Sequence, residues 1–331
     1  MTTIYDIAEL SGYSITTVSK VLNDYPNVSQ KAKKKVMQAV DELGYTPNSS
    51  ARTLVTNKSW LIGVVFSENL GVGIAHPFFS EVIESFKKHV ELYNFDLLFL
   101  SRNRGLEQET FNHLKHRGVD GVVVVQAFGD NMVNIDESPF PIVFIDLPVD
   151  RPSSVHSDNR HGSKLAVDHL VDLGHKKIAH IMGEQTVFAA DERIKGFKKA
   201  MESHNLAIPE TYMVSGGYFS YEGGREAMIK LLANQDKPTA VVVSGDMMAI
   251  GAMKVIEEAG LKVPDDISII GFDDIAIAKH TNPPLTTIKQ DKELIGRQAA
   301  IMLLDKMNGE TKQYTKVVPV QLIKRGSCRA L

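Results

Sequence analysis

The sequence predicts a small helical domain at the N-terminus, joined by a linker to a larger α/β body. In residues 1–46 the apolar side chains recur at helical spacing, and residues 47–58 are mostly polar. From Trp60 onward, short apolar runs alternate with amphipathic segments. Alternation of this kind is typical of parallel sheets covered by helices. We therefore divide the chain into a head at 1–46, a hinge linker at 47–58 and a body at 59–331.

The head is predicted to form three helices, at Ile4–Leu10, Ile15–Asn23 and Gln30–Leu43. Gly12 separates the first two because it is able to adopt a left-handed conformation, and Ser14 is a suitable N-cap for the second. Two short helices separated by about four residues with a central glycine are typical of a helix-turn-helix.

The second helix is built from poor helix formers. Ile, Val and Thr favour strands, yet Ile15, Val18, Val21 and Leu22 are spaced as on one side of a helix. Val18, Val21 and Leu22 are the best candidates for attaching this helix to the head core.

The charge of the chain is uneven. Residues 1–58 hold seven Lys/Arg against five Asp/Glu, whereas the whole chain of 331 residues has a net charge of −3. A slightly basic head on an acidic body points weakly to phosphate contacts by the head. The single cysteine, Cys328, is unable to form an internal disulfide, and the N-terminus lacks the apolar region of a signal peptide. We expect a cytoplasmic protein.

The body is predicted to contain two lobes, since it has more strands than one core holds comfortably. The expected strands are Leu61–Phe66, Asp96–Leu100, Gly121–Val125, Ile142–Ile145, Ile178–Met182, Ala240–Val243 and Ile267–Gly271. The expected helices are Phe79–Tyr93, Leu106–Arg117, Arg160–Leu173, Ala189–His204, Tyr221–Leu232, Asp246–Ala259 and Gln290–Met307.

Motifs for catalysis are lacking. The sequence has no G-x-S-x-G and no G-x-x-x-x-G-K-[ST], and the stretch GVGIAH at 71–76 has His76 where a third glycine is needed. His113 and His116 are spaced for one helix face, but no third metal ligand is suggested. We predict that the protein is not an enzyme and uses no cofactor and no metal.

A ligand-binding cleft is predicted instead, because ligands of parallel sheets sit beyond the carboxyl ends of the strands. Asp146 follows one strand and Asp273 another, Arg193 is expected to open a helix, and HPFF follows the first strand at 76–79. Carboxylates, a guanidinium and aromatic faces suit a hydroxyl-rich ligand. Asp246, which comes shortly after the expected strand Ala240–Val243, is a further candidate. The alternative for Asp246 is a role as a helix N-cap alone, and the alternative for Asp273-Asp274 is a turn alone.

The ordered motifs resemble one family across nearly the whole chain. The stretch IYDIAELSGYSITTVSKVLNDYPNVSQKAKKKVMQAVDELGYTPNSSARTL is similar to the head and hinge of lactose/galactose repressors (the LacI/GalR family). The likeness continues through HPFFSEVIESF, VDHLVDLGHKKIAHI, ERIKGFKKAM, KPTAVVVSGDMMAIGAMKVIEEAGLKVPDDISIIGFDD and PPLTTIKQD. The resemblance implies a body like the periplasmic sugar-binding proteins, and a homodimer, or a tetramer, on a pseudo-palindromic operator.

The resemblance also implies the DNA-binding residues. Ile15, Thr16 and Lys20 match positions that face base edges, with Lys20 standing where arginine is common. Ser14, Thr17, Ser19 and Asn23 match phosphate contacts, and Asn48, Ala51 and Leu54 match hinge contacts. Leu54 is expected to wedge into the minor groove, which bends DNA; docking onto the body is the alternative.

Effector-binding positions are carried over in the same way. They map onto Pro77, Phe79, Asp146, Arg193, Phe219, Asp273 and Gln290, while Gly245 stands where many relatives have a ligand-binding asparagine. We expect a regulator, most simply a repressor, controlled by a small carbohydrate. A nucleobase or a phosphoprotein effector is the alternative, and a solute-binding protein without a transcriptional role is a second one.

Overall fold

The computed structural model describes residues 2–22, 25, 27–45, 58–67, 73–102, 108–125, 138–147 and 153–331. Backbone contacts divide the chain into two compact units, Met1–Leu61 and Ile62–Leu331, each with its own hydrophobic core. No helix in the described ranges combines the length and apolar composition that a membrane crossing requires.

The head consists of three helices around one small core, as predicted. They are α1 (Ile4–Ser11), α2 (Ile15–Leu22) and α3 (Gln30–Leu43), and each packs against the other two. Gly12 (φ 73°) ends α1 and Gly44 (φ 59°) ends α3 in the left-handed conformation that favours glycine. The buried core residues are Ile7, Val18, Val21, Val36 and Ala39.

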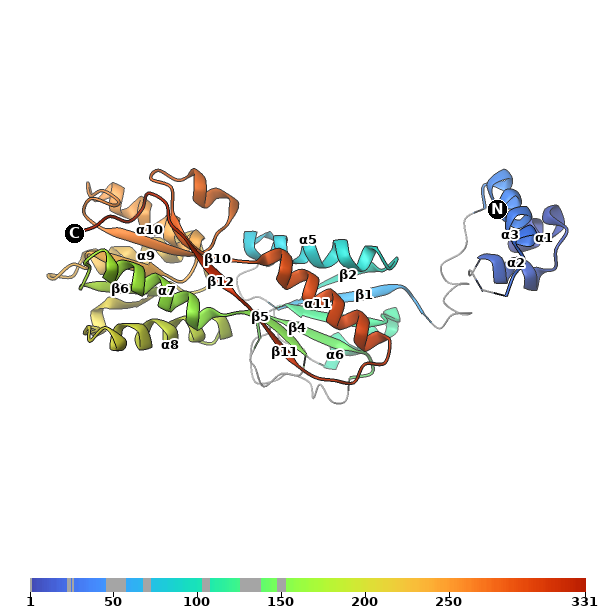
Figure 1. The fold of residues 1–331 in the computed structure, drawn as a ribbon, viewed down its shortest axis with the longest axis horizontal. Helices are drawn as coiled ribbons and strands as arrows, with labels where there is room; N and C mark the ends of the chain where they lie inside the picture. The colour runs from blue at the N-terminus through green and yellow to red at the C-terminus, as the bar shows by residue number, and fades with distance from the viewer. Residues whose placement is uncertain are drawn as a thin grey trace. The chain divides into compact units, whose positions relative to one another are not determined.

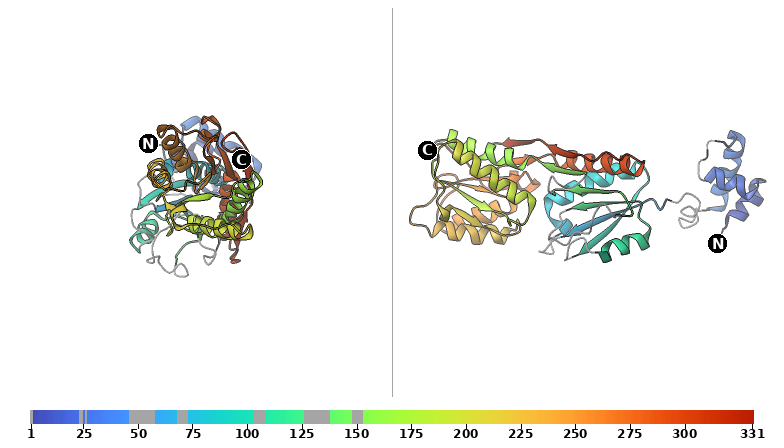
Figure 2. Two further views of the ribbon diagram at one scale, coloured as in Figure 1. Left: turned by 90° about the vertical axis from the view of Figure 1, so that its left-hand side faces the viewer. Right: turned by 90° about the horizontal axis from the view of Figure 1, so that it is seen from below.

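The body consists of two α/β lobes, as predicted, and Figures 1 and 2 show both. The first lobe contains β1 (Leu61–Ser67), η1 (Gly73–Ala75), α5 (Pro77–Glu91), β2 (Asp96–Arg102), α6 (Gln108–Arg117), β3 (Gly121–Val125), β4 (Ile142–Ile145), β5 (Ser154–Ser157), α11 (Lys292–Met307) and β11 (Thr315–Val318). Its sheet has the order β11-β5-β4-β3-β1-β2.

The second lobe is arranged in the same way around its own sheet. It contains α7 (Asn159–Asp172), β6 (Ile178–Met182), α8 (Phe188–Ser203), η3 (Glu210–Tyr212), β7 (Met213–Ser215), α9 (Tyr221–Leu232), β8 (Ala240–Val243), α10 (Asp246–Glu258), β9 (Ser268–Asp273), η4 (Ala276–His280), β10 (Thr286–Gln290) and β12 (Val320–Ile323). The sheet order is β12-β10-β9-β8-β6-β7, and β12 pairs antiparallel with β10 whereas β9 pairs parallel with it.

Both faces of the second sheet are buried, which explains its apolar strands. In β8, Val241 and Val243 contribute to the core under α9 and α10, whereas Ala240 and Val242 contribute to the core under α7 and α8. The alternation follows from the two-residue period of a strand. Figure 1 shows the two helix layers on either side of this sheet.

The two lobes are linked by chain crossings. In the described part of the body the chain passes from one lobe to the other after β5, after β10 and between β11 and β12. After the crossing that follows β10, Asp291 sets the start of α11. Its carboxylate accepts a hydrogen bond from the Leu294 backbone N–H (2.9 Å) and so caps this helix.

Several predicted boundaries were wrong. The helix predicted from Gln290 begins at Lys292, and Gln290 instead ends β10. The strand predicted at Ile267–Gly271 runs to Asp273, and Arg193 lies in the second turn of α8 rather than opening it. The prediction missed β5, β7, β10, β11 and β12, which are short or rich in polar residues.

Candidate functional site

The exposed side of α2 is the candidate DNA-contacting surface. Ser14, Thr16 and Lys20 are exposed, and Ile15 is 41% exposed although it is a large apolar residue. Val18 is fully buried. With about 100° of rotation per residue, positions 15, 16 and 20 fall within an arc of roughly 140°, turned away from the core.

Hydroxyl groups stand at the beginning of the same helix. The Ser14 hydroxyl accepts a hydrogen bond from the Thr17 backbone N–H (3.2 Å) and lies 2.9 Å from the Thr17 hydroxyl. Thr17 and Ser19 are half-buried. Asn23, Asn48, Ala51 and Leu54 lie outside the described residues, so their predicted roles remain predictions.

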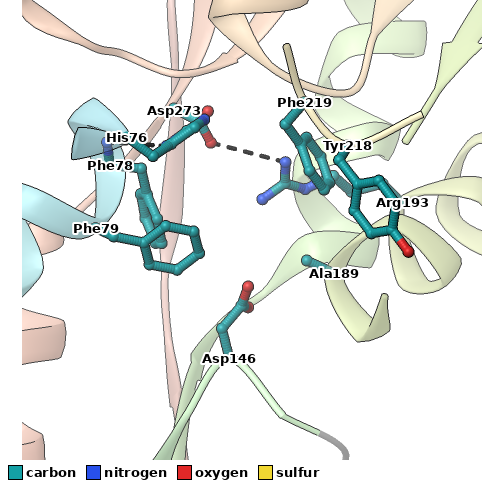
Figure 3. Close-up of a pocket in the computed structure, with 9 residues that line it drawn as sticks. All are labelled: His76, Phe78, Phe79, Asp146, Ala189, Arg193, Tyr218, Phe219 and Asp273. Atoms are coloured by element: carbon teal, nitrogen blue, oxygen red, sulfur yellow. Dashed lines mark hydrogen bonds and ion pairs between the residues drawn. The ribbon is translucent and has the colours of Figure 1, made fainter. Parts of the chain in front are cut away.

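A pocket opens between the two lobes of the body. It encloses about 440 Å³ of empty space, part of it open to solvent. Figure 3 shows the residues that line it: His76, Phe78, Phe79, Asp146, Ala189, Arg193, Tyr218, Phe219 and Asp273.

Arg193 is the most constrained of these side chains. The residue is 3% exposed, and its guanidinium donates from Nε to the Asn159 side-chain oxygen (2.8 Å) and from Nη1 to the Ser244 carbonyl. The guanidinium carbon lies 3.8 Å from the centre of the Phe272 ring, and Nη1 lies 3.7 Å from Asp273 Oδ1. Burial lowers the pKa of Arg193, and the neighbouring carboxylates oppose this shift.

Asp273 is held from behind by two side chains, those of Gln290 and Lys292. Gln290 Nε2 donates to its Oδ1 (2.6 Å), and the buried Lys292 ammonium donates to the backbone carbonyls of Asp273 (3.0 Å) and Asp274 (2.8 Å). The Lys292 ammonium also forms an ion pair with Glu81 of α5 (3.3 Å). Gln290 therefore acts on Asp273 and does not line the pocket.

Asp146 supplies the other carboxyl group, from the end of β4. It is 5% exposed, and burial raises its pKa while Arg193 opposes that shift. Asp146, Phe219 and Asp273 have positive φ angles of 60°, 46° and 113°. Residues in such sparsely populated backbone conformations cluster at ligand sites.

The pocket brings together Phe79, Asp146, Arg193, Phe219 and Asp273 of the predicted effector residues. Pro77 is the first residue of α5 and, like Gln290, is not among the lining residues. His76, Phe78, Ala189 and Tyr218 were not proposed as effector residues, although the run HPFF had already singled out the first two. Tyr218 follows β7, a strand too short for its sequence to reveal. For Asp246, a role as a helix N-cap was the alternative to ligand contact. Its buried carboxylate accepts hydrogen bonds from the Thr287 hydroxyl (2.6 Å) and the Ile275 backbone N–H (2.9 Å).

A buried histidine, His180 of β6, contacts the same Ser244 as Arg193 does. Its Nε2 lies 3.3 Å from the Ser244 hydroxyl and its ring stacks on Phe197. Burial lowers the pKa of His180 to about 4, below its ordinary value of 6.5. The unfolded chain therefore binds a proton at a higher pH than the folded chain does.

We expect the body to lose stability as the pH falls from 6.5 toward 4, since protonation then favours the unfolded state. Between pH 7 and pH 5, His180 alone contributes a loss of about 2 kcal/mol in the free energy of unfolding. Urea unfolding at both pH values measures this loss. His180→Gln should reduce the difference, whereas His116→Gln, at an exposed position on α6, should leave it unchanged. An unchanged difference in His180→Gln would contradict the assignment.

Comparison with known proteins identifies the class. Residues 3–48 match the family model for bacterial regulatory proteins of the lacI family, and residues 167–328 match that of a periplasmic binding protein-like domain. The chain is similar to the transcriptional regulator CelR of Thermobifida fusca (33% identity, 96% of this chain and 95% of CelR). It is also similar to the transcriptional repressor PurR of Haemophilus influenzae strain PittEE (35% identity, all of both chains).

Solved structures agree. The structure of the lac repressor dimer bound to operator and the anti-inducer ONPF matches with a TM-score of 0.89, at 32% identity over 99% of each chain. The complex of CelR with cellobiose matches with a TM-score of 0.76, at 30% identity over 99% of this chain and 100% of that one. The protein is thus a DNA-binding transcriptional regulator, not an enzyme. It belongs to the lacI family of bacterial regulatory proteins.

Proposed function

We propose that the protein represses transcription from a pseudo-palindromic operator, and that a neutral, hydroxyl-rich ligand in the interlobe pocket controls its binding to DNA. The observation that carries the ligand class is the buried Arg193, which lies in the pocket together with Asp146 and Asp273. Carboxylates and a guanidinium form paired hydrogen bonds with vicinal hydroxyls, and aromatic rings stack on the apolar face of a sugar.

The charges of the pocket argue against an anionic ligand. Two carboxyl groups accompany one guanidinium, whose Nη1 is already occupied by Asp273 and the Ser244 carbonyl. His76 adds no positive charge at neutral pH, because burial lowers its pKa below the ordinary 6.5. The Lys292 ammonium is bound to Glu81 and to backbone carbonyls. A sugar acid or sugar phosphate therefore meets an unfavourable field.

A nucleobase is the second candidate ligand. The rings of Phe79 and Phe219 lie at opposite sides of the pocket (Figure 3), and aromatic rings also stack on planar bases. Both candidates use the same pocket, so one screen separates them.

Repression requires the head to read DNA as part of a symmetric assembly. We propose that the chain acts as a homodimer, or as a tetramer, with α2 of each head in the major groove. Ile15, Thr16 and Lys20 would then face bases, and Ser14 and Thr17 would contact phosphates, because small hydroxyl side chains allow close approach of the helix. Leu54 remains the predicted minor-groove wedge.

A thermal-shift screen tests the ligand class. A neutral sugar at 100 times its dissociation constant should stabilise the body by about 2.7 kcal/mol, an increase of roughly 5 °C in the melting temperature. The matched sugar acids, sugar phosphates and purines should give no increase. A larger shift with a sugar acid or a sugar phosphate than with the neutral sugar would contradict the charge argument. A shift with purines alone would favour the nucleobase.

A further inference from the structure

Two glycines lie at the carboxyl ends of parallel strands in the second lobe, where side chains usually contact ligands. Gly183 directly follows β6, and Gly245 lies just after β8 as the N-cap of α10. Neither glycine is required by its backbone. Gly245 has an extended conformation (φ −165°), and Gly183 is not among the residues with positive φ.

The ring of Phe219 lies against both glycines, and a Cβ atom at Gly183 would in addition lie 3.0 Å from Ala190 Cβ. A Cβ atom at Gly183 would lie 2.7 Å from Phe219 Cζ and 2.9 Å from Cε1. A Cβ atom at Gly245 would lie 3.1 Å from Phe219 Cδ1. The first approach is closer than real Cβ contacts allow and the second is tight, so a side chain at either position requires the ring to move.

The ring is also fixed on its other sides. The Arg193 guanidinium carbon lies 5.5 Å from its centre, and the ring packs against the cluster of Val187, Ala189 and Ala190. The Phe219 backbone has a φ of 46°, in the left-handed region. The ring therefore has little room except toward the cavity that it lines (Figure 3).

We propose that Gly183 and Gly245 determine ligand specificity by seating Phe219. Their missing side chains let the ring lie back against the strand ends, which sets the depth of the pocket next to Arg193. A larger residue at either position displaces the ring into the cavity and favours smaller ligands. This inference rests on the proposed function for its ligand, but the seating of the ring can be tested without any ligand.

A double-mutant cycle in the full-length protein without ligand tests the seating. Gly183→Ala should lower the melting temperature of the body by about 4 °C, and in a Phe219→Ala background by less than half as much. Gly245→Ala, whose Cβ makes the milder contact, should lower the melting temperature by less. This decrease should likewise become smaller in the Phe219→Ala background. Gly326→Ala is the control, because its Cβ would lie at a similar 3.2 Å from Pro283 Cβ, away from Phe219. Equal decreases with and without the Phe219 ring would overturn the proposal.

Binding of D-ribose, D-glucose and cellobiose to the same variants tests the specificity. With Phe219 present, Gly183→Ala should change the ratio of affinities for ribose and cellobiose at least about tenfold in favour of ribose. The Phe219→Ala background should abolish this change, and Gly326→Ala should not produce it. An unaltered ratio, in variants whose melting temperatures show the seating, would overturn the role in specificity. If none of a wider range of neutral sugars binds the wild type, the proposed function fails, while the ligand-free cycle still decides whether the glycines seat the ring.

Discussion

Replacing Arg193 by methionine is expected to abolish sugar binding and to destabilise the body by about 3–5 kcal/mol. The large effect arises because Arg193 is buried with Asp273 and Asp146, and removing one member of a buried charge cluster leaves the others uncompensated. Urea unfolding measures the loss of stability, and isothermal titration with the sugar found by thermal shift measures the loss of binding.

Arg193→Lys separates binding from folding. Lysine keeps the positive charge but has no planar fork with which to bridge Asn159, the Ser244 carbonyl and a ligand. We expect it to retain most of the stability and to weaken sugar binding at least about tenfold. Arg160→Met is the matched control, since Arg160 is largely exposed and paired with Glu192 outside this pocket. Wild-type sugar affinity in Arg193→Lys would refute the assignment.

Replacing Ile15, Thr16 and Lys20 together by alanine is expected to weaken operator binding by at least about 100-fold. Each base contact typically contributes about 1–3 kcal/mol, and the three side chains share the exposed side of α2. The head should remain folded, because Val18 and Val21 are untouched and alanine favours helix. The operator is first selected from randomised duplexes with the wild type, and fluorescence anisotropy then compares the affinities.

The control for this experiment changes another exposed side of the head. Met37→Ala with Gln38→Ala alters two exposed residues of α3 and should leave operator affinity unchanged. Binding to an unrelated duplex should fall much less than operator binding in the triple variant, because phosphate contacts are independent of sequence. If the triple variant still prefers the operator to the unrelated duplex as strongly as the wild type does, other residues recognise the bases.

The sequence predicted the head almost completely because its signals are local. Caps and breaks at Ser14, Gly12 and Gly44 set the helix ends, and the period of Val18 and Val21 showed which side is buried. The period alone grouped Ile15 with these valines, and its position outside the core was expected only from the family resemblance. Poor helix propensity in α2 did not matter, since tertiary packing overrides it.

In the body, the bounds of the strands were predicted correctly where the strands are uniformly apolar. The runs that form β3, β4, β6 and β8 have the predicted bounds because both of their faces are buried. Strands such as β11 and β10 were missed, since edge positions and polar side chains remove the apolar signal.

The candidate site was predicted only in part. Asp146 and Asp273 follow from the rule for strand ends, but Tyr218 and Ala189 reach the pocket through a loop and a helix start that only tertiary structure positions. Gln290 was assigned to a helix and to ligand contact; the structure places it in β10, behind Asp273. No local pattern indicates that Gly183 and Gly245 leave room for Phe219.

Control of DNA binding by a ligand requires coupling between the pocket and the DNA-binding head. The most direct test titrates the sugar into the protein–operator complex and follows operator affinity by fluorescence anisotropy. Since typical coupling free energies correspond to about 5–150-fold changes, we predict a change of at least fivefold in the wild type and a much smaller one in Arg193→Lys at the same sugar concentration. If the sugar binds the wild type and operator affinity stays the same, the pocket does not control DNA binding, which would contradict the proposed function.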